Sequence, residues 1–170
     1  NIVGNEGQMT VTKDELVYTV VCNSAGTSAG YIEINPISGN FPWLRGVAKS
    51  WERIVWHSLS VSYRSMVSAT TSGAIAYGAD WTLKANSDRE SVTSLAPVAD
   101  HPVWNSTTRS LVLPANMLRS RLQYNLDTGD AVDKSPGRVV FNVKGSTPGA
   151  TVGELWFRYK VTLSGPRKAD

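Results

Sequence analysis

The sequence is poor in the residues that build disulfide scaffolds and membrane spans. Cys22 is the only cysteine among 170 residues, so no disulfide can form within the chain. It contains no run of about 18 apolar residues, which argues against a transmembrane helix, and its start lacks the pattern of a signal peptide. We therefore expect residues 1–170 to form a single folded domain without a disulfide and without a membrane partner.

The groupings that enzymes use are missing as well. His57 and His101 are the only histidines, and neither has a second histidine or a cysteine at zinc-site spacing. The chain has no Gly-x-Ser-x-Gly elbow, reactive-cysteine signature or phosphate-binding glycine loop. His57 is interpreted as a hydrogen-bonded core histidine on a strand, and His101, which precedes Pro102, is placed in a turn. The protein is expected not to be an enzyme.

Charge is low and only slightly positive. Lys and Arg total 17 against 14 Asp and Glu, which gives a net charge of +3. A dedicated nucleic-acid-binding domain carries a denser basic patch, whereas here the basic residues are scattered. The chain starts at Asn1 without an initiator methionine, so we expect a preceding segment. If the protein holds nucleic acid, most of the positive charge lies in that segment.

Alternation of apolar and polar residues dominates the chain. A period of two residues predicts strands with one face on a core, and glycine- and proline-rich segments such as Gly145–Gly149 predict the turns between them. About eight strands are expected: Val11–Cys22, Tyr31–Asn35, Ile54–Arg64, Gly73–Asp80, Ser110–Leu113, Leu122–Asn125, Val139–Val143 and Val152–Leu163.

Two short segments have helical spacing instead. The first has Asn40 as its cap, Pro42 in its first turn and a set of apolar residues on one face, namely Trp43, Leu44, Val47, Ala48, Trp51 and Ile54. The second begins at Asp88, a good N-cap, and places Val92, Leu95 and Ala96 on one face. The two helices follow the second and the fourth predicted strands.

This order of elements predicts an all-β fold, an eight-stranded antiparallel jelly-roll β-sandwich with two short helices in its connecting loops. Two other jelly-roll classes stay open. A carbohydrate- or ligand-binding lectin would use a loop of acids, for which Asp127, Asp130 and Asp133 are available. A cupin-type enzyme would need a histidine-rich metal site, which two distant histidines do not supply.

An ordered series of segments resembles the coat proteins of small icosahedral plant RNA viruses. Phe41–Ala48, followed by Trp51-Glu52 and a strand ending at Tyr63, resembles the region between two shell strands of sobemoviruses and the tombusvirus group. Later segments resemble later parts of the same shells: Ser72–Gly78, Ser94–Asn105, Pro136–Val140 and Val152–Tyr159. The sobemovirus shell domain looks most similar because no protruding domain follows in these residues. The tombusvirus group is the alternative.

The resemblance implies a structural protein. Identical coat-protein subunits would self-assemble into an icosahedral, T=3-like capsid that encloses the viral genomic RNA. The protein would be found in the virion and, during assembly, in the host cytoplasm. The resemblance also implies a basic N-terminal arm that neutralises RNA phosphates independently of sequence.

The family commonly binds calcium between subunits, through two carboxylates three residues apart after a strand. Here the sequence departs from the pattern, because Asp88 fits the second carboxylate while Ala85 occupies the first position. The resemblance thus leaves Asp80, Asp88 and Asp170 as expected calcium ligands, with a neighbouring subunit supplying further oxygens. The alternative is that Asp88 only caps a helix and Asp80 only ends a strand.

Six tryptophans are many for such a chain. Alternation places Trp56 and Trp156 on the polar faces of their strands, and large aromatics on polar faces are typical of subunit contacts. Packing beneath a helix or loop of the same domain is the alternative.

Overall fold

The protein is described by a computed structural model, which covers residues 2–5, 7–38, 41–107, 109–126 and 129–166. Along the chain the elements are β1 (Ile2–Asn5), β2 (Gln8–Val21), β3 (Ser28–Glu33), α1 (Pro42–Ala48), β4 (Trp51–Ser65), β5 (Ala74–Asp80), α2 (Arg89–Thr93), β6 (Val98–Pro102), β7 (Leu111–Leu113), α3 (Ala115–Leu118), β8 (Tyr124–Asn125), α4 (Ala131–Lys134), β9 (Arg138–Lys144) and β10 (Thr151–Pro166).

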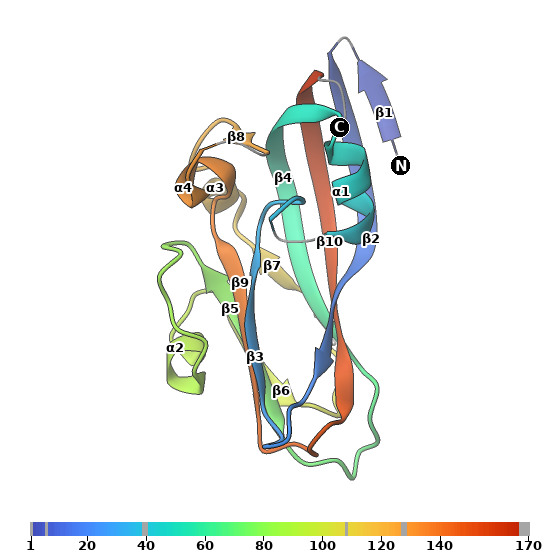
Figure 1. Cartoon of the computed structure of the whole chain (residues 1–170), viewed down its shortest axis with the longest axis vertical. Coiled ribbons are helices and arrows are strands. Elements are labelled where there is room, and N and C mark those ends of the chain that lie inside the picture. The colour runs from blue at the N-terminus through green and yellow to red at the C-terminus, as the bar shows by residue number, and fades with distance from the viewer. Residues whose placement is uncertain (1, 6, 39–40, 108, 127–128, 167–170) are drawn as a thin grey trace.

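The strands form two sheets that face each other (Figure 1). The first sheet has the order β1-β2-β10-β4-β7, with β8 also pairing β4, and the second has the order β3-β9-β5-β6. The paired strands are antiparallel, and the chain passes repeatedly from one sheet to the other. This is a jelly-roll sandwich, so the predicted fold class is confirmed.

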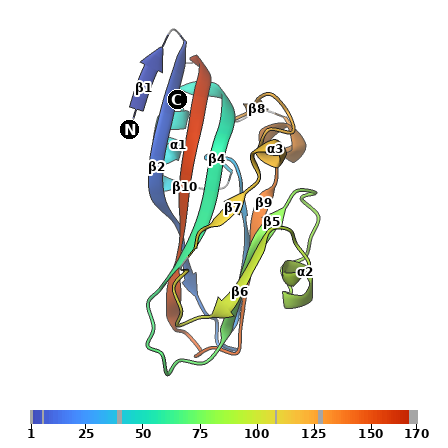
Figure 2. The ribbon, with the colours of Figure 1, turned by 180° about the vertical axis from the view of Figure 1, so that it is seen from behind.

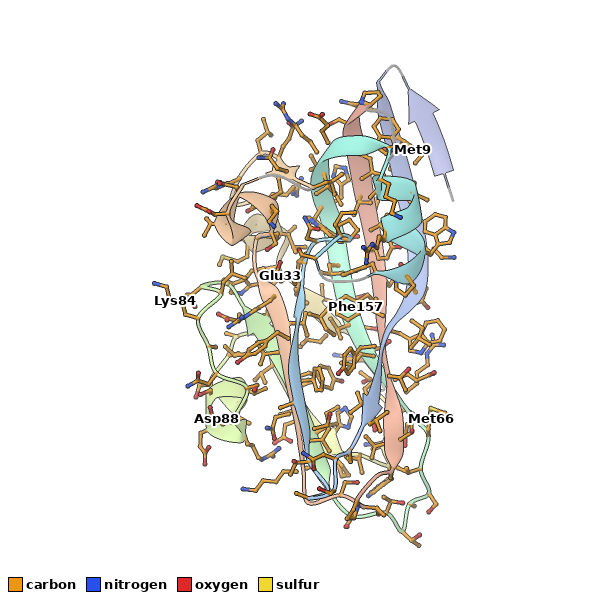
Figure 3. The ribbon with its side chains drawn as sticks, in the orientation of Figure 1. Met9, Glu33, Met66, Lys84, Asp88 and Phe157 are labelled. Atoms are coloured by element: carbon orange, nitrogen blue, oxygen red, sulfur yellow. The ribbon has the colours of Figure 1, made fainter. Side chains whose placement is uncertain are left out.

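Apolar side chains from the inner faces of both sheets fill the space between them. Figure 3 shows Phe157 of β10 pointing into this space. Phe41, which precedes α1, is fully buried and has its ring 5.3 Å from that of Phe157 and 5.9 Å from that of Tyr159. Contacts of this kind between aromatic rings add to the burial of their area. Together with buried Leu44 and Ala48, they hold α1 against the first sheet.

A β-bulge in β4 reverses the predicted faces of its first half. Lys160 of β10 lies opposite Ser58, but the next residue, Val161, lies opposite Trp56, so His57 is the extra residue. One extra residue turns the side chains before it to the other face. Trp56 is therefore fully buried, not on the polar face as predicted, and His57 lies on the outer face rather than in the core.

The second predicted helix has the expected cap, but both helices are shorter than expected. α2 ends at Thr93, so the place of Leu95 and Ala96 in it was wrong. Asp88 is the N-cap of α2. The helix α1 ends at Ala48, and Trp51 and Ile54 belong to β4, so their place in the first helix was wrong. Phe41 takes the N-cap position of α1 without a side-chain hydrogen bond, and Asn40 lies outside the described residues.

Two strands, β1 and β6, were not expected. β6 pairs with β5 at the edge of the second sheet, and His101 lies in it opposite Ile75, so its placement in a turn was wrong. Pro102 is tolerated because this is an edge strand, where one row of backbone N–H groups needs no partner. The predicted strand Leu122–Asn125 shrinks to β8, and β1, α3 and α4 are additional.

Candidate functional site

Asp80, the first predicted metal ligand, lies at the end of β5 in a closed set of hydrogen bonds. Its Oδ1 accepts from the backbone N–H and the hydroxyl of Thr82, at 3.1 and 2.8 Å. Its Oδ2 accepts from the N–H of Ala85 at 3.0 Å and from Nε of Arg138 at 3.1 Å. Burial raises the pKa of Asp80, but these hydrogen bonds outweigh it and hold the pKa below its ordinary value.

Arg138 fixes this arrangement from the neighbouring strand. Its Nη2 donates to the carbonyl oxygen of Ala85 at 2.9 Å, and its guanidinium group lies 3.9 Å from the ring centroid of Tyr31. The Asp80–Arg138 pair is largely buried, with side-chain exposures of 2% and 18%. Both partners are hydrogen-bonded further, as a buried ion pair requires. The pair therefore ties the loop after β5 to β9.

Asp88, the second predicted ligand, is exposed on the outer side of the second sheet (Figure 3). Its carboxylate accepts from the Ser91 hydroxyl at 2.8 Å and from the Ser91 N–H at 3.4 Å, which caps α2. The Ser91 hydroxyl holds the pKa of Asp88 below its ordinary value. Asp170 lies outside the described residues.

Within the residues the structure describes, no group of three or more His, Cys, Asp or Glu side chains could hold a metal ion. Calcium takes six to eight oxygen ligands, usually several carboxylates. Each carboxylate oxygen of Asp80 already accepts hydrogen bonds from two donors, so Asp80 does not fit a calcium ligand within one subunit. Of the acids in the lectin alternative, Asp133 pairs with Arg121 at 2.5 Å, and Asp127 lies outside the described residues.

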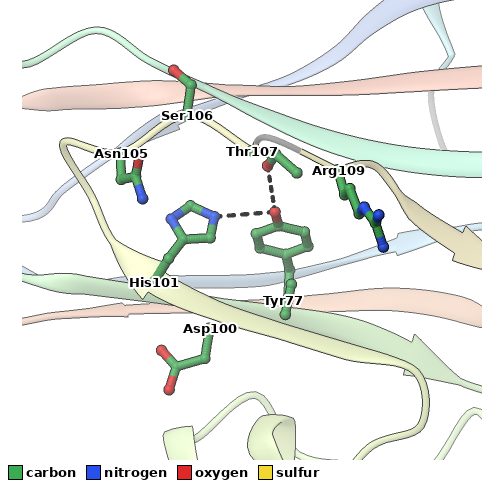
Figure 4. A pocket seen from close by; sticks show the side chains of 8 residues that line it. Tyr77, Asp100, His101, Asn105, Ser106, Thr107 and Arg109 are labelled. Atoms are coloured by element: carbon green, nitrogen blue, oxygen red, sulfur yellow. Dashed lines mark hydrogen bonds between the residues drawn. The ribbon is translucent and has the colours of Figure 1, made fainter.

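A polar pocket opens beside β6, where no motif in the sequence pointed to a site (Figure 4). The hydroxyl of Tyr77 lies 2.6 Å from Oγ1 of Thr107 and 3.1 Å from Nε2 of His101. Thr107 also accepts from the N–H of Tyr63 at 2.8 Å, and burial raises the pKa of Tyr77. These bonds hold the segment after β6 against the sheet.

The outer face of the first sheet carries a second group of polar side chains. Here Nε2 of His57 lies 2.7 Å from Oγ1 of Thr162, which lies 3.1 Å from Oγ1 of Thr10. Burial, followed by the nearby charges of Arg119 and Lys160, lowers the pKa of His57. A basic environment therefore surrounds the histidine on this face.

Trp156 lies on this same face, as predicted, and is half-buried. The guanidinium group of Arg64 stacks 3.7 Å from the ring centroid of Trp156 and also pairs with Asp14 at 3.2 Å. Nε1 of Trp156 donates a hydrogen bond to Glu154. Trp104 is 42% exposed in the turn after β6. Contacts of tryptophans with neighbouring subunits stay a prediction.

The comparisons with known proteins agree with the topology. The viral coat protein (S domain) family matches residues 2–169. The capsid protein of maize chlorotic mottle virus is 29% identical over 167 residues, which cover 91% of this chain and 67% of that protein.

Solved virus structures share the fold. The chain superposes on that of cucumber necrosis virus with a TM-score of 0.84 at 21% identity, covering 98% of this chain and 59% of that one. Tobacco necrosis virus gives a TM-score of 0.77 at 17% identity, with 95% and 98% covered. The chain thus spans about three fifths of the first of these proteins and nearly all of the second.

Fold and matched residues together define a shell-forming domain of a virus particle. The chain belongs to the viral coat protein (S domain) family. Its role is structural, which favours the capsid interpretation over the lectin alternative. The resemblance seen in the sequence is confirmed at this level, whereas the choice between sobemoviruses and the tombusvirus group stays a prediction. No helix among the described residues is long and apolar enough to cross a membrane.

Proposed function

We propose that identical copies of this chain form the wall of an icosahedral, T=3-like capsid that encloses viral genomic RNA, and that the domain has no catalytic activity. The observation that carries this proposal is the family match over residues 2–169 on a two-sheet jelly roll. A basic arm preceding Asn1 would supply most of the phosphate neutralisation, in keeping with the net charge of only +3. The protein acts in the virion, after assembly in the host cytoplasm without a membrane partner.

Assembly and RNA enclosure are tested together. The protein, expressed with its natural N-terminus, is mixed with RNA and analysed by sedimentation velocity, and the fast fraction is treated with ribonuclease. We expect particles of many subunits whose RNA survives the nuclease. Monomers or small oligomers under all salt, pH and calcium conditions would overturn the assembly proposal, and particles whose RNA is digested would overturn enclosure.

Calcium between subunits remains a proposal for Asp88 and Asp170. Asp88 is exposed whereas Asp80 is buried, and a neighbouring subunit would have to complete the coordination of Asp88. Calcium titration calorimetry of assembled particles tests this. We expect Asp88→Asn to abolish the binding heat, while Glu52→Gln, which changes an exposed acid on β4 of the other sheet, retains it. Equal heat from wild type and Asp88→Asn would remove Asp88 from the site.

A further inference from the structure

The loop between β5 and α2, residues 81–88, has no regular secondary structure, and Figure 2 shows it at the outer side of the second sheet, beyond the end of β5. Its side chains alternate in exposure. The partly buried ones are Trp81, Leu83, Ala85 and Ser87, and the exposed ones are Thr82, Lys84, Asn86 and Asp88. Because the loop lacks a ladder of backbone hydrogen bonds, other contacts must hold it in place.

Leu83, in the middle of this loop, has a backbone conformation that its own side chain disfavours. Its φ angle is 60°, and it is the one residue other than glycine with a positive φ among those the structure describes. A β-carbon makes this left-handed region unfavourable, and a residue stays there only where surrounding contacts impose it. The shape of the loop is therefore set by contacts rather than by local preference.

The carboxylate of Asp80 supplies such contacts on both sides of Leu83. It accepts hydrogen bonds from the N–H groups of Thr82 and Ala85, at 3.1 and 3.0 Å. These two bonds bring the backbone before and after Leu83 to a single side chain. The Asp80 side chain is only 2% exposed, so its charge needs a cation beside it.

Arg138 of β9 is that cation. Its Nε donates to Asp80 at 3.1 Å and its Nη2 to the carbonyl oxygen of Ala85 at 2.9 Å. Carboxylate and carbonyl oxygens are also the ligands that calcium takes from protein loops. Here, however, N–H and O–H groups already point at both carboxylate oxygens, and the ring centroid of Tyr31 lies 3.9 Å from the guanidinium group. Arg138 therefore occupies the position in which a metal ion would have to bind.

The end of the loop is fixed by the same strand. Asn142 stands four residues after Arg138 in β9, so both side chains lie on the same face of the second sheet. The Nδ2 of Asn142 donates to the carbonyl oxygen of Ser87, directly before Asp88, at 2.7 Å. β9 thus holds the loop at two points, Ala85 and Ser87, and both contacts come from side chains of the chain itself.

We propose that the guanidinium group of Arg138 takes the place of a metal ion in shaping residues 81–88, so that this loop, with Asp88 at its end, keeps the same conformation with and without calcium. The sequence departs from the coat-protein calcium pattern at Ala85, and it is the carbonyl oxygen of Ala85 that Arg138 binds. A loop shaped in advance loses less conformational entropy when Asp88 meets a partner. The proposal concerns the folded chain alone and does not require the particle.

Amide hydrogen exchange of residues 1–170, followed by NMR, tests this proposal, because the Thr82 and Ala85 amides exchange when their bonds to Asp80 open. Wild type is measured in excess calcium and in excess EGTA. Two variants are measured in EGTA. Arg138→Met removes the guanidinium group, and the control, Arg158→Met, removes an exposed guanidinium group from β10 of the first sheet. Circular dichroism checks that each variant is folded.

We expect equal protection of both amides in wild type with calcium and with EGTA. Arg138→Met should lower their protection about 10- to 100-fold, because hydrogen bonds to a charged group are lost. The control variant should match wild type. Lower wild-type protection in EGTA than in calcium would overturn the proposal, and so would wild-type protection in a folded Arg138→Met.

Arg138→Met leaves Asp80 buried without a cation, which destabilises the whole fold as well as the loop. If that variant does not fold, Asp80→Asn/Arg138→Met replaces it, because the double change buries no unpaired charge. The same loss of protection is expected at Ala85, which loses both the guanidinium group and a charged acceptor. Unchanged protection of Ala85 in the double variant would equally overturn the proposal.

This outcome is independent of assembly. Loop amides that need calcium for their protection, in a protein that forms particles, would refute this inference and leave the proposed coat function standing. Loop amides that stay protected in EGTA, in a protein that forms no particles under any condition, would refute assembly and leave the inference standing.

Discussion

The hydroxyl of Tyr159 donates a hydrogen bond of 2.6 Å to Oε1 of Glu15, which lies 144 residues away in the chain. The other carboxylate oxygen of Glu15 accepts from the backbone N–H of Trp43 in the first turn of α1. Glu15 is only 4% exposed. One buried carboxylate thus joins β2, β10 and α1, and it satisfies an N–H group that a helix start leaves without a partner.

Removing the Tyr159 hydroxyl should therefore destabilise the fold. We expect Tyr159→Phe to lower the free energy of unfolding by about 1–3 kcal/mol, because a buried carboxylate loses a donor. Urea denaturation followed by tryptophan fluorescence measures the change. Tyr18→Phe, at a position 38% exposed, is the matched control and should stay within about 0.5 kcal/mol of wild type. Equal effects from both variants would contradict a role for this bond.

Gly153 in β10 provides the surface on which the Tyr63 ring lies. A Cβ atom at this position would stand 2.5 Å from Cε1, Cζ and Oη of Tyr63. The Tyr63 hydroxyl lies 2.7 and 2.8 Å from the carbonyl oxygens of Val103 and Val152, so the ring has little freedom to move.

We predict that Gly153→Ala lowers the free energy of unfolding by about 1–3 kcal/mol through overpacking. Gly46→Ala in α1 is its control, since a Cβ there meets nothing within 4 Å. Because alanine is the better helix former, that variant should be unchanged or gain up to about 1 kcal/mol. Thermal unfolding of the two variants beside wild type decides the matter, and a neutral Gly153→Ala would show that Tyr63 is not confined.

His57 should make the stability depend on pH. Burial, together with Arg119 at the end of α3 and Lys160 on β10, lowers its pKa from the ordinary 6.5 in the folded chain. As the pH falls through 6.5, the unfolded chain therefore takes up this proton before the folded one, and His57's contribution to stability decreases. Above that value both states are neutral at His57 and the contribution is complete.

The pH dependence is measured by urea denaturation between about pH 5 and pH 7.5, where histidine is the side chain that ordinarily titrates. We expect His57→Gln to lose less stability on acidification than wild type does. His101→Gln, which leaves His57 in place, should keep the additional loss. Parallel curves for wild type and His57→Gln would contradict the assignment.

The fold was predictable because alternation, turns and caps are local signals. Asp88 could be recognised as a helix cap from its neighbours alone. Trp56 was placed on the wrong face because nothing in the sequence marks His57 as the extra residue of a bulge, and one such residue inverts the pattern before it. β6 was missed because Pro102 and two polar residues obscure a strand that is tolerated only at a sheet edge.

The candidate sites were harder to predict from the sequence than the fold, because they are formed by contacts between residues far apart in the chain. The ion pair of Asp80 with Arg138 joins positions 58 residues apart, and no local pattern announces it.

Electron cryomicroscopy of the protein assembled with RNA tests the proposed coat function most directly. We expect closed icosahedral shells whose wall is built from repeated copies of this two-sheet domain, with RNA density inside. Preparations that contain only monomers or small open oligomers under all conditions tried, in protein shown to be folded, would contradict it.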